Sequence, residues 1–268
     1  METEEKSEKP KTIDEYTKWL KDHLSIEIDG RHKRQYESGT DLMSNKFKES
    51  ELWSQILLNI KEFNETYQIE HDGYSLYPYI PKLEILTKSY NSLYEKTFRK
   101  NILENSNWVK EPKGGWITPD NWFSRIDDIL RTRFVVKYLD GVEFLLSRFS
   151  ELCDDLKLTH NEELKAKEEG YYAAHLYVVN EFEIPDLEYG SKKAEVTIEL
   201  QITTHLQEVI ETLTHKYYEK RRKIMKDENF KWQWDYNSEE FAANYLAHIL
   251  HYVEGMIMEI RSKQTGET

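Results

Sequence analysis

The chain has 268 residues, of which 38% are hydrophobic and 13% aromatic, and its 37 basic and 50 acidic residues give a net charge of −13. A chain of this length can form one large domain or two domains, and its aromatic content excludes a largely disordered chain. The negative charge excludes a general affinity for duplex DNA or anionic membranes, so any phosphate site must be a local basic pocket. Cys153 is the only cysteine, which excludes an intrachain disulfide and a cysteine-rich zinc site.

Two further features bear on location. The sequence contains no apolar run close to the ~18 residues that cross a bilayer. Residues 1–11 are polar and lack the apolar segment of a secretory signal. We therefore expect a cytoplasmic protein with no membrane partner.

The first third of the chain is predicted to be helical. Apolar residues recur at helical spacing over residues 13–24, 47–67 and 82–103. Residues 105–121 contain two glycines, two prolines and two tryptophans, which predicts a stretch of turns. A strand is expected at residues 133–139, followed by a helix from about residue 140 to residue 153.

The second half begins with two predicted strands, at residues 171–184 and 194–203. In the second of these, apolar and polar residues alternate strictly, and Glu199 lies in the middle of the polar face. Amphipathic helices are then expected at residues 205–225 and 241–260.

These elements predict an α+β fold, with a mixed central β-sheet flanked by N- and C-terminal helices. We divide the chain into an N-terminal helical region (1–104), a central core (105–225) and a C-terminal helical extension (226–268). No segment has the composition of a flexible interdomain linker, so we expect the three regions to form one compact body.

Carboxylates occur at two places in the predicted sheet where they need an explanation. Asp128 lies just before a strand, where a fixed backbone can present a metal ligand; the alternative is a solvated charged surface. Glu199 lies on the face of a strand, where glutamate is uncommon. A metal ion, a substrate hydroxyl or a cross-strand cation would each account for it.

A third polar segment runs from Lys167 to His175. In an extended chain, Tyr171 and His175 lie on the same face of the strand. An exposed tyrosine can stack on a nucleic acid base, while lysine and histidine can donate hydrogen bonds to phosphate. The alternative is a hairpin strand with Tyr171 packed in the core.

The order and spacing of these segments resemble the synthetase domain of the RelA/SpoT family, the (p)ppGpp synthetases, over about residues 105–220. Asp-Ile-Leu-Arg-Thr-Arg at residues 128–133 resembles the family pattern Asp-Ile-x-Gly-x-Arg. Residues 167–175 retain all four fixed residues of Lys-x-x-Gly-Tyr-x-x-x-His. Glu-Leu-Gln-Ile-Thr-Thr at residues 199–204 resembles Glu-Ile-Gln-Ile-Arg-Thr, and His215 falls where the next family helix carries a histidine.

The resemblance implies a nucleotidyltransferase-like synthetase domain that acts as a pyrophosphokinase. Such enzymes transfer the β,γ-pyrophosphate of ATP to the ribose 3′-hydroxyl of GDP or GTP. By resemblance, Asp128 and Glu199 would hold Mg²⁺, Glu199 would also take the proton of the attacking hydroxyl, Tyr171 would stack on the acceptor base, and Arg133, Lys167 and His175 would contact phosphates. The two carboxylates would then lie within roughly 4–6 Å of each other.

The chain departs from the family pattern within these motifs. Arg131 stands where the family has glycine, Thr203 where it has arginine, and Tyr172-Ala173 where it often has Arg-Ser. We expect the guanidinium of Arg131 to replace the phosphate contact that is lost at Thr203.

The basic motif that grips ATP in the family has no clean counterpart upstream of Asp128. The nearby basic residues are Arg99, Lys100, Lys110 and Lys113. Lys110 and Lys113 precede two glycines, so this segment could form a phosphate-binding loop or a plain surface turn.

The departures leave three functions open. The first is synthesis of (p)ppGpp. The second is a toxin-type relative that pyrophosphorylates the 3′ end of tRNA, or an enzyme that makes adenosine alarmones; a toxin of this kind implies an antitoxin partner. The third is a catalytically silent nucleotide-binding module. The sequence does not fix the oligomeric state.

Two further patterns have a structural and a functional interpretation. The basic run at residues 216–226 is either a solvated helix end or a contact for RNA phosphates. His248 and His251 are three residues apart on the last predicted helix, where they could bind a metal or pack against aromatic neighbours.

Overall fold

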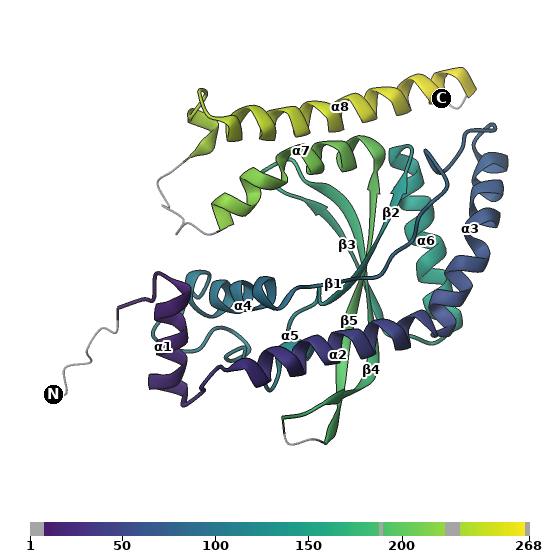
Figure 1. The fold of residues 1–268 in the computed structure, drawn as a ribbon. Helices are drawn as coiled ribbons and strands as arrows, with labels where there is room; N and C mark the ends of the chain where they lie inside the picture. The colour runs from purple at the N-terminus through teal and green to yellow at the C-terminus, as the bar shows by residue number, and fades with distance from the viewer. Residues whose placement is uncertain (1–7, 188–189, 223–230, 266–268) are drawn as a thin grey trace. The chain divides into compact units, whose positions relative to one another are not determined.

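The computed structural model describes residues 8–187, 190–222 and 231–265, without the side chains of residues 215–222 and 265. The described chain contains both helices and strands (Figure 1). In order they are α1 (Ile13–Leu24), α2 (Gly30–Lys48), α3 (Glu51–Glu70), β1 (Leu86–Thr87), α4 (Tyr90–Phe98), the short π-helix Arg99–Leu103, α5 (Trp122–Arg125), β2 (Leu130–Val136), α6 (Leu139–Asp155), β3 (His160–Ala166), β4 (Tyr172–Pro185), β5 (Ser191–Thr204), α7 (His205–Arg222), the 3₁₀ turn Trp232–Trp234 and α8 (Glu239–Thr265).

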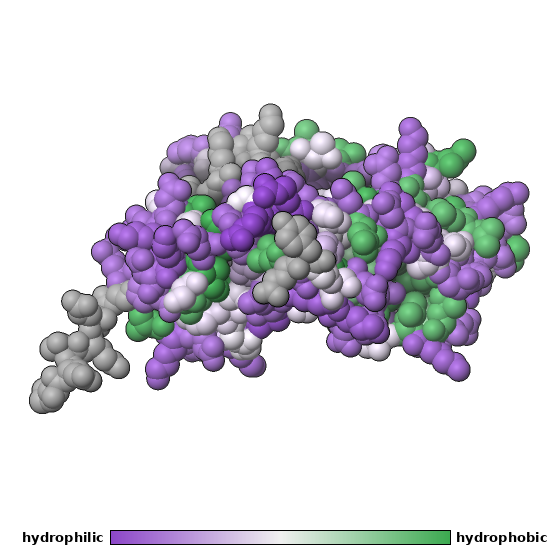
Figure 2. Space-filling model, turned by 60° about the horizontal axis from the view of Figure 1, so that its bottom comes forward, coloured by the Kyte–Doolittle hydropathy of each residue, from purple (hydrophilic) through white to green (hydrophobic). Residues whose placement is uncertain are grey.

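The strands form one mixed sheet in the order β1-β2-β5-β4-β3. With helices before and after it along the chain, this sheet confirms the predicted α+β class. No described helix is long and apolar enough to cross a membrane. Figure 2 shows one face of the molecule, on which hydrophilic side chains predominate and hydrophobic ones form separate patches.

The chain is organised into two compact units that interleave along the sequence. The first unit comprises Met1–Lys46, Leu86–Leu130 and Asn180–Ile198. The second unit comprises Phe47–Ile85, Arg131–Val179 and Glu199–Thr268. The division into regions 1–104, 105–225 and 226–268 stays a prediction, because compactness alone does not define functional regions.

An aromatic core holds the first unit together. Tyr16, Trp19 and Leu20 on α1 are buried against Phe98 and Ile102. Burial raises the pKa of the Tyr16 hydroxyl to about 12, so this hydroxyl stays protonated. It accepts a hydrogen bond of 2.8 Å from the fully buried Asn101 side chain. The core therefore fixes α1 against the end of α4.

In the second unit, strands β3 and β4 form an antiparallel hairpin whose turn carries part of the candidate site. Strand β3 pairs with the start of β4, with His160 opposite Val178 and Ala166 opposite Tyr172. The turn between them is closed by hydrogen bonds from Lys167 N to Tyr171 O (3.0 Å) and from Gly170 N to Lys167 O (2.9 Å). Gly170 has a φ of +83°, which favours glycine. This turn positions Lys167 and Tyr171.

Most predicted elements are present, but one predicted helix is wrong. The stretch 82–103 contains β1, and its helix begins only at Tyr90, where the Ser89 side chain caps the Ser92 amide. The expected helix at 47–67 begins at Glu51, because α2 extends through Lys48 and Ser50 caps the next helix. Strands β2, β4 and β5 lie within three residues of the expected positions.

Candidate active site

The centre of the candidate site is a chain of three hydrogen-bonded side chains in the second unit. Tyr171 directly precedes β4, His175 lies on β4, and Glu199 lies on β5. The Tyr171 hydroxyl is 2.9 Å from Nε2 of His175, and Nδ1 of His175 is 2.5 Å from Oε1 of Glu199. His175 and Glu199 are each 5% exposed, whereas Tyr171 is partly exposed.

The environment of the Tyr171 hydroxyl determines its protonation state. Burial raises the pKa of Tyr171, and the charges of Glu211 and Glu199 add to this effect. The phenol therefore stays protonated and can donate its hydrogen bond to Nε2 of His175. Nδ1 of His175, when it carries the ring proton, can donate to Glu199.

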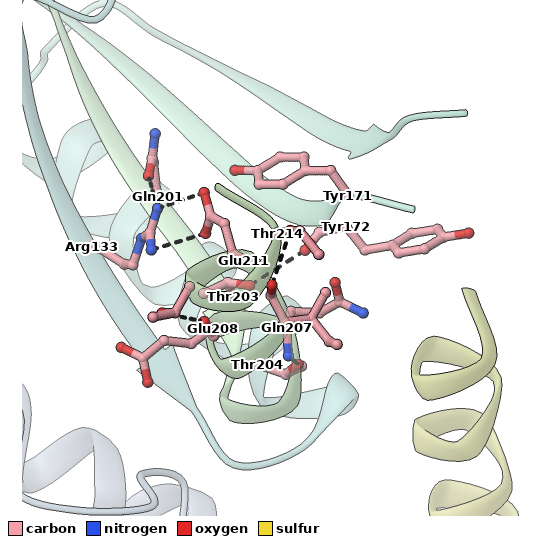
Figure 3. Close-up of polar contacts among 12 residues, drawn as sticks. Arg133, Tyr171, Tyr172, Gln201, Thr203, Thr204, Gln207, Glu208, Glu211 and Thr214 are labelled. Carbon is pink, nitrogen blue, oxygen red and sulfur yellow. Dashed lines mark hydrogen bonds and ion pairs between the residues drawn. The ribbon is translucent and has the colours of Figure 1, made fainter. Parts of the chain in front are cut away.

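Strand β2 contributes two arginines with different surroundings. Arg133 forms an ion pair with Glu211 on α7 (Nη1 to Oε2, 2.9 Å), and its Nη2 is 3.2 Å from Oε1 of Gln201. Figure 3 shows this group beside the Tyr171 ring. Arg131 is exposed, and no ion pair to it is found among the described residues. Its charge acts on the Tyr171 hydroxyl and lowers the pKa of that group, against the larger effect of burial.

The next residue, Tyr172, points to the opposite side of the strand, toward α8 (Figure 3). Its ring stacks on His251, with centroids 3.6 Å apart, and its hydroxyl is 2.8 Å from Nδ1 of His248. Nε2 of His248 is 2.9 Å from the Glu168 carbonyl oxygen, within the turn between β3 and β4. The two histidines therefore pack α8 against the turn that carries Tyr171. Among the described residues, no cluster of potential metal ligands includes them.

Asp128 belongs to the first unit, where two lysines surround it. Lys88 Nζ is 2.8 Å from Oδ2, and Lys96 Nζ is 2.9 Å from Oδ1. Burial raises the pKa of Asp128, but the charges of Lys96 and Lys88 outweigh burial and hold the pKa well below its usual range. This carboxylate is therefore ionised at neutral pH. Its expected proximity to Glu199, which lies in the second unit, stays a prediction.

Several predicted site residues are thus brought together and others are not. In the second unit the Tyr171 hydroxyl contacts His175 and is acted on by the charges of Arg131, Arg133 and Glu199. The Lys167 ammonium is 4.9 Å from the centre of the Tyr171 ring. Lys110 and Lys113 are exposed in the first unit, in a loop whose Gly114 carbonyl oxygen accepts a hydrogen bond from Arg125. The His215 side chain and the basic run at 216–226 lie outside the described residues.

The contacts of His175 add a role to the expected phosphate contact, which stays a prediction. A direct phosphate contact was expected for this residue, but both ring nitrogens already have protein partners: Nε2 has Tyr171, and Nδ1 has Glu199 and the Tyr177 hydroxyl at 3.2 Å. In this arrangement His175 links Tyr171 to Glu199.

Sequence reasoning missed residues whose roles depend on folding. Lys88 and Lys96 are eight residues apart, and they meet at Asp128 because Lys88 follows β1 whereas Lys96 lies near the end of α4. Glu211 lies on α7 and reaches Arg133 on β2, and no motif links these two positions. The only sequence signal for the two lysines is their place upstream of Asp128, where a basic ATP-binding motif was sought.

The donor chemistry of the site fits Mg²⁺. This ion is usually held by one or two carboxylates together with substrate phosphates, not by a cage of protein ligands. In the structure Asp128 is ion-paired with Lys88 and Lys96, and Glu199 contacts Nδ1 of His175. No cluster of three potential metal ligands occurs among the described residues, and a shared magnesium site stays a prediction.

Comparisons with known proteins identify the fold. No protein-family model matches the sequence, and no characterised protein sequence does. A GTP pyrophosphokinase family protein from Streptococcus pneumoniae has a similar structure, with a TM-score of 0.51 at 17% identity over 83% of this chain and 94% of that chain. Small alarmone synthetase 1 from Bacillus subtilis gives a TM-score of 0.48 at 17% identity, over 81% of this chain and all of that chain. The resemblance to RelA/SpoT-type synthetases is therefore confirmed for the fold, a single-domain synthetase fold of this kind.

Proposed function

We propose that this protein is an ATP-dependent pyrophosphokinase that transfers the β,γ-pyrophosphate of ATP to the 3′-hydroxyl of GDP or GTP. The observation that carries the proposal is the connected chain Tyr171–His175–Glu199, which links a partly exposed aromatic ring to a buried carboxylate. Two arginines act on the same tyrosine. The fold shared with a GTP pyrophosphokinase family protein supports the same reaction class.

Tyr171 is proposed to bind the acceptor base by stacking. Its ring is partly exposed, and hydrogen bonding of its hydroxyl to His175 restricts the ring's orientation. The ammonium of Lys167 near the ring supplies positive charge for the acceptor phosphates. Stacking tolerates different bases, so the choice of guanine must come from other contacts.

Glu199 is proposed to act as the general base. The acceptor 3′-oxygen attacks the β-phosphorus of ATP, and a bond forms between these two atoms. The bond from the β-phosphorus to the oxygen that bridges the α- and β-phosphates breaks, and AMP leaves with that oxygen. The 3′-hydroxyl proton passes to the Glu199 carboxylate, which His175 Nδ1 orients by its contact with Oε1.

Phosphate binding is proposed for residues of both units. Arg131 and Arg133 are placed near the acceptor tyrosine, and Lys88 and Lys96 supply two cations beside Asp128 in the other unit. Lys110 and Lys113 are exposed and could reach phosphates from their loop. Mg²⁺, proposed at Asp128 and Glu199, would neutralise phosphate charge, which is the main requirement of phosphoryl transfer.

A labelling experiment tests this function. The protein is incubated with γ-³²P-ATP and Mg²⁺, with GDP, GTP, ATP or total tRNA as the acceptor in separate reactions. Labelled guanosine product together with AMP is expected. Label on tRNA or on an adenine nucleotide would overturn the acceptor assignment, and no transfer to any acceptor would overturn the enzyme assignment.

A pair of glutamate variants tests the proposed base. Glu199→Gln should reduce transfer by at least ~100-fold, the lower range for a lost general base. Glu208→Gln is the matched control, because this carboxylate lies on α7 of the same unit but binds the Tyr79 hydroxyl. Equal activities of the two variants would contradict the role of Glu199.

A further inference from the structure

The turn between β3 and β4 lies directly against helix α8. Gly170, in this turn, is buried. A Cβ at this position would be 2.6 Å from the Cβ of Ala247 and 3.0 Å from the carbonyl oxygen of Asn244. Only glycine allows the turn and the helix to approach so closely. The backbone that leads into Tyr171 therefore rests on α8 with no side chain between them.

His248 on α8 joins the two sides of this turn. Its Nε2 is 2.9 Å from the carbonyl oxygen of Glu168, and its Nδ1 is 2.8 Å from the hydroxyl of Tyr172. A carbonyl oxygen can only accept a hydrogen bond, so Nε2 carries the ring proton and donates to it. In the neutral ring, Nδ1 then accepts a hydrogen bond from the Tyr172 hydroxyl. The side chain of Gln233, in the 3₁₀ turn ahead of α8, also binds the Glu168 carboxylate.

These contacts act on Tyr171 through the residue that follows it. Consecutive residues of an extended chain project from opposite faces, and Figure 3 shows the rings of Tyr171 and Tyr172 pointing in opposite directions. The Tyr172 ring is stacked on His251 of α8, with centroids 3.6 Å apart and planes within 9°. On the other face, the Lys167 ammonium is 4.9 Å from the centre of the Tyr171 ring. Helix α8 thus holds this backbone from the side opposite to the candidate site.

We propose that His248 is a positioning residue, which holds Lys167 and Tyr171 in the orientation that binds the acceptor nucleotide. This role rests on the proposed function of Tyr171. Lys167 and Glu168 are exposed, so contacts with α8 are needed to restrict the turn that carries them. A site that adopts its binding conformation only part of the time binds its ligand more weakly by that fraction. His248 therefore increases the affinity for the acceptor by keeping the turn in one conformation.

The same role accounts for two sequence features that the reaction leaves unexplained. Tyr172 stands where RelA/SpoT synthetases often have arginine. In this chain its ring points away from the site and contacts α8, so position 172 holds the turn. The pair His248 and His251 on α8 supplies the two partners of this tyrosine, one by a hydrogen bond and one by stacking.

Steady-state kinetics test the role of His248. His248→Ala removes two hydrogen bonds, each equivalent to a ~2- to 12-fold change, so the KM for GDP should rise ~5- to 100-fold. The kcat and the KM for ATP should change less than ~2-fold, because Lys88 and Lys96, proposed to bind phosphate beside Asp128, lie in the first unit. His248→Gln, whose amide can still donate to the Glu168 carbonyl oxygen, should restore part of the affinity.

His160→Ala is the matched control. This histidine also contacts a backbone carbonyl oxygen, with Nδ1 3.2 Å from that of Leu158. It lies at the start of β3, opposite Val178 and therefore at the end of the hairpin away from the turn. The control variant should leave the KM for GDP unchanged. Equal values of KM for GDP in His248→Ala and His160→Ala would overturn the positioning role.

Hydrogen exchange of the full chain without nucleotides tests the same contacts apart from the reaction. The amides of Lys167 and Gly170 are hydrogen-bonded within the turn. In His248→Ala they should exchange at least ~5-fold faster than in the wild type or in His160→Ala, because the turn opens more often. Unchanged exchange would also overturn the positioning role. A wild-type chain that transfers no pyrophosphate would instead refute the proposed function, which these two outcomes leave standing.

Discussion

Tyr171 offers the sharpest test of the proposed acceptor site, because its ring and its hydroxyl have separate roles. The ring is proposed to stack on the acceptor base, and the hydroxyl is hydrogen-bonded to Nε2 of His175 at 2.9 Å. Tyr171→Phe removes only the hydroxyl, whereas Tyr171→Ala removes both.

The structure sets the expected size of each effect. A neutral hydrogen bond contributes about 0.5–1.5 kcal/mol, so Tyr171→Phe should lower kcat/KM for the acceptor by ~2- to 12-fold. Stacking on an aromatic ring contributes about 1–3 kcal/mol, so Tyr171→Ala should lower the same quantity by ~10- to 2,000-fold when the lost hydrogen bond is included. The KM for ATP should change less than ~2-fold in both variants, because stacking acts on the acceptor.

The assay is initial-rate transfer from γ-³²P-ATP at varied acceptor and then at varied ATP concentrations. Tyr236→Ala serves as the control for loss of a tyrosine ring, because Tyr236 is 74% exposed and lies outside the site. Thermal unfolding of each variant separates loss of function from loss of structure. If Tyr171→Ala left kcat/KM for the acceptor unchanged, or raised the KM for ATP equally, the stacking role would be refuted.

Three further predictions concern the contacts around the site. Lys96→Met should lower the free energy of unfolding by about 1–3 kcal/mol at pH 7, because Asp128 loses one of two charged partners. Since the pKa of Asp128 is depressed in the folded state, this loss of stability should shrink in urea titrations as the pH falls below ~4. The control Lys263→Met, which removes a lysine from an exposed pair, should show no such pH dependence. Burial raises the pKa of Glu254, so the folded protein loses stability as the pH rises through that pKa and the carboxyl group ionises. Glu254→Gln should therefore raise the urea midpoint of unfolding more at pH 8 than at pH 5. An equal shift of the midpoint at both pH values would contradict this. Gly170→Ala should lower the free energy of unfolding by about 2–4 kcal/mol, since the new Cβ would be 2.6 Å from the Cβ of Ala247 and the left-handed backbone adds strain. The control Gly73→Ala, at a position with φ +82° and open space around it, should lower it by only about 1–2 kcal/mol in the same thermal unfolding assay.

The sequence predicted the fold best where the pattern had only one structural solution. Strand β5 alternates strictly, so the strand and the place of Glu199 on its polar face could be read directly. The burial of Glu199 could not be read, because both faces are covered from Ile198 to Thr204. Helix α2 was missed because its sequence is mostly polar and contains Gly39. In the structure this glycine accommodates Phe123, whose Cζ would be 2.9 Å from a Cβ at that position. Packing, not local preference, determines that helix.

The candidate site was predictable only in part for a related reason. Motifs within one segment, such as Tyr171 and His175 on one strand face, follow from strand geometry. Partners from different segments do not: Glu211 with Arg133, and Lys88 with Lys96 around Asp128, are set by tertiary structure. Strand β3 was missed because it is an exposed, polar edge strand without an apolar face.

The structure also bears on how the chain could function without the family's arginine at Thr203. The Thr203 hydroxyl instead donates a hydrogen bond of 3.3 Å to the Tyr172 carbonyl oxygen, so it contributes to strand pairing and supplies no charge. Arg133 is already paired with Glu211. Arg131 is exposed near Tyr171 and has no ion pair within the described part of the chain. It is therefore the arginine of β2 best placed to bind a phosphate.

Substitutions at Arg131 test this compensation. Arg131→Gly removes the charge and should lower kcat/KM for transfer by ~10- to 100-fold, from the 1.5–3 kcal/mol of a charge-assisted hydrogen bond. Arg131→Lys keeps the charge but cannot reproduce the planar fork of two donors, so its loss should be smaller but still measurable. Arg148→Lys on α6 of the same unit, which pairs with Glu70 and Glu151, controls for replacement of a guanidinium. Wild-type turnover by Arg131→Gly would show that Arg131 does not replace the lost arginine. The phosphate contact would then have to come from Arg133 after it separates from Glu211, and Glu211→Gln, which weakens that pair, would be expected to raise activity.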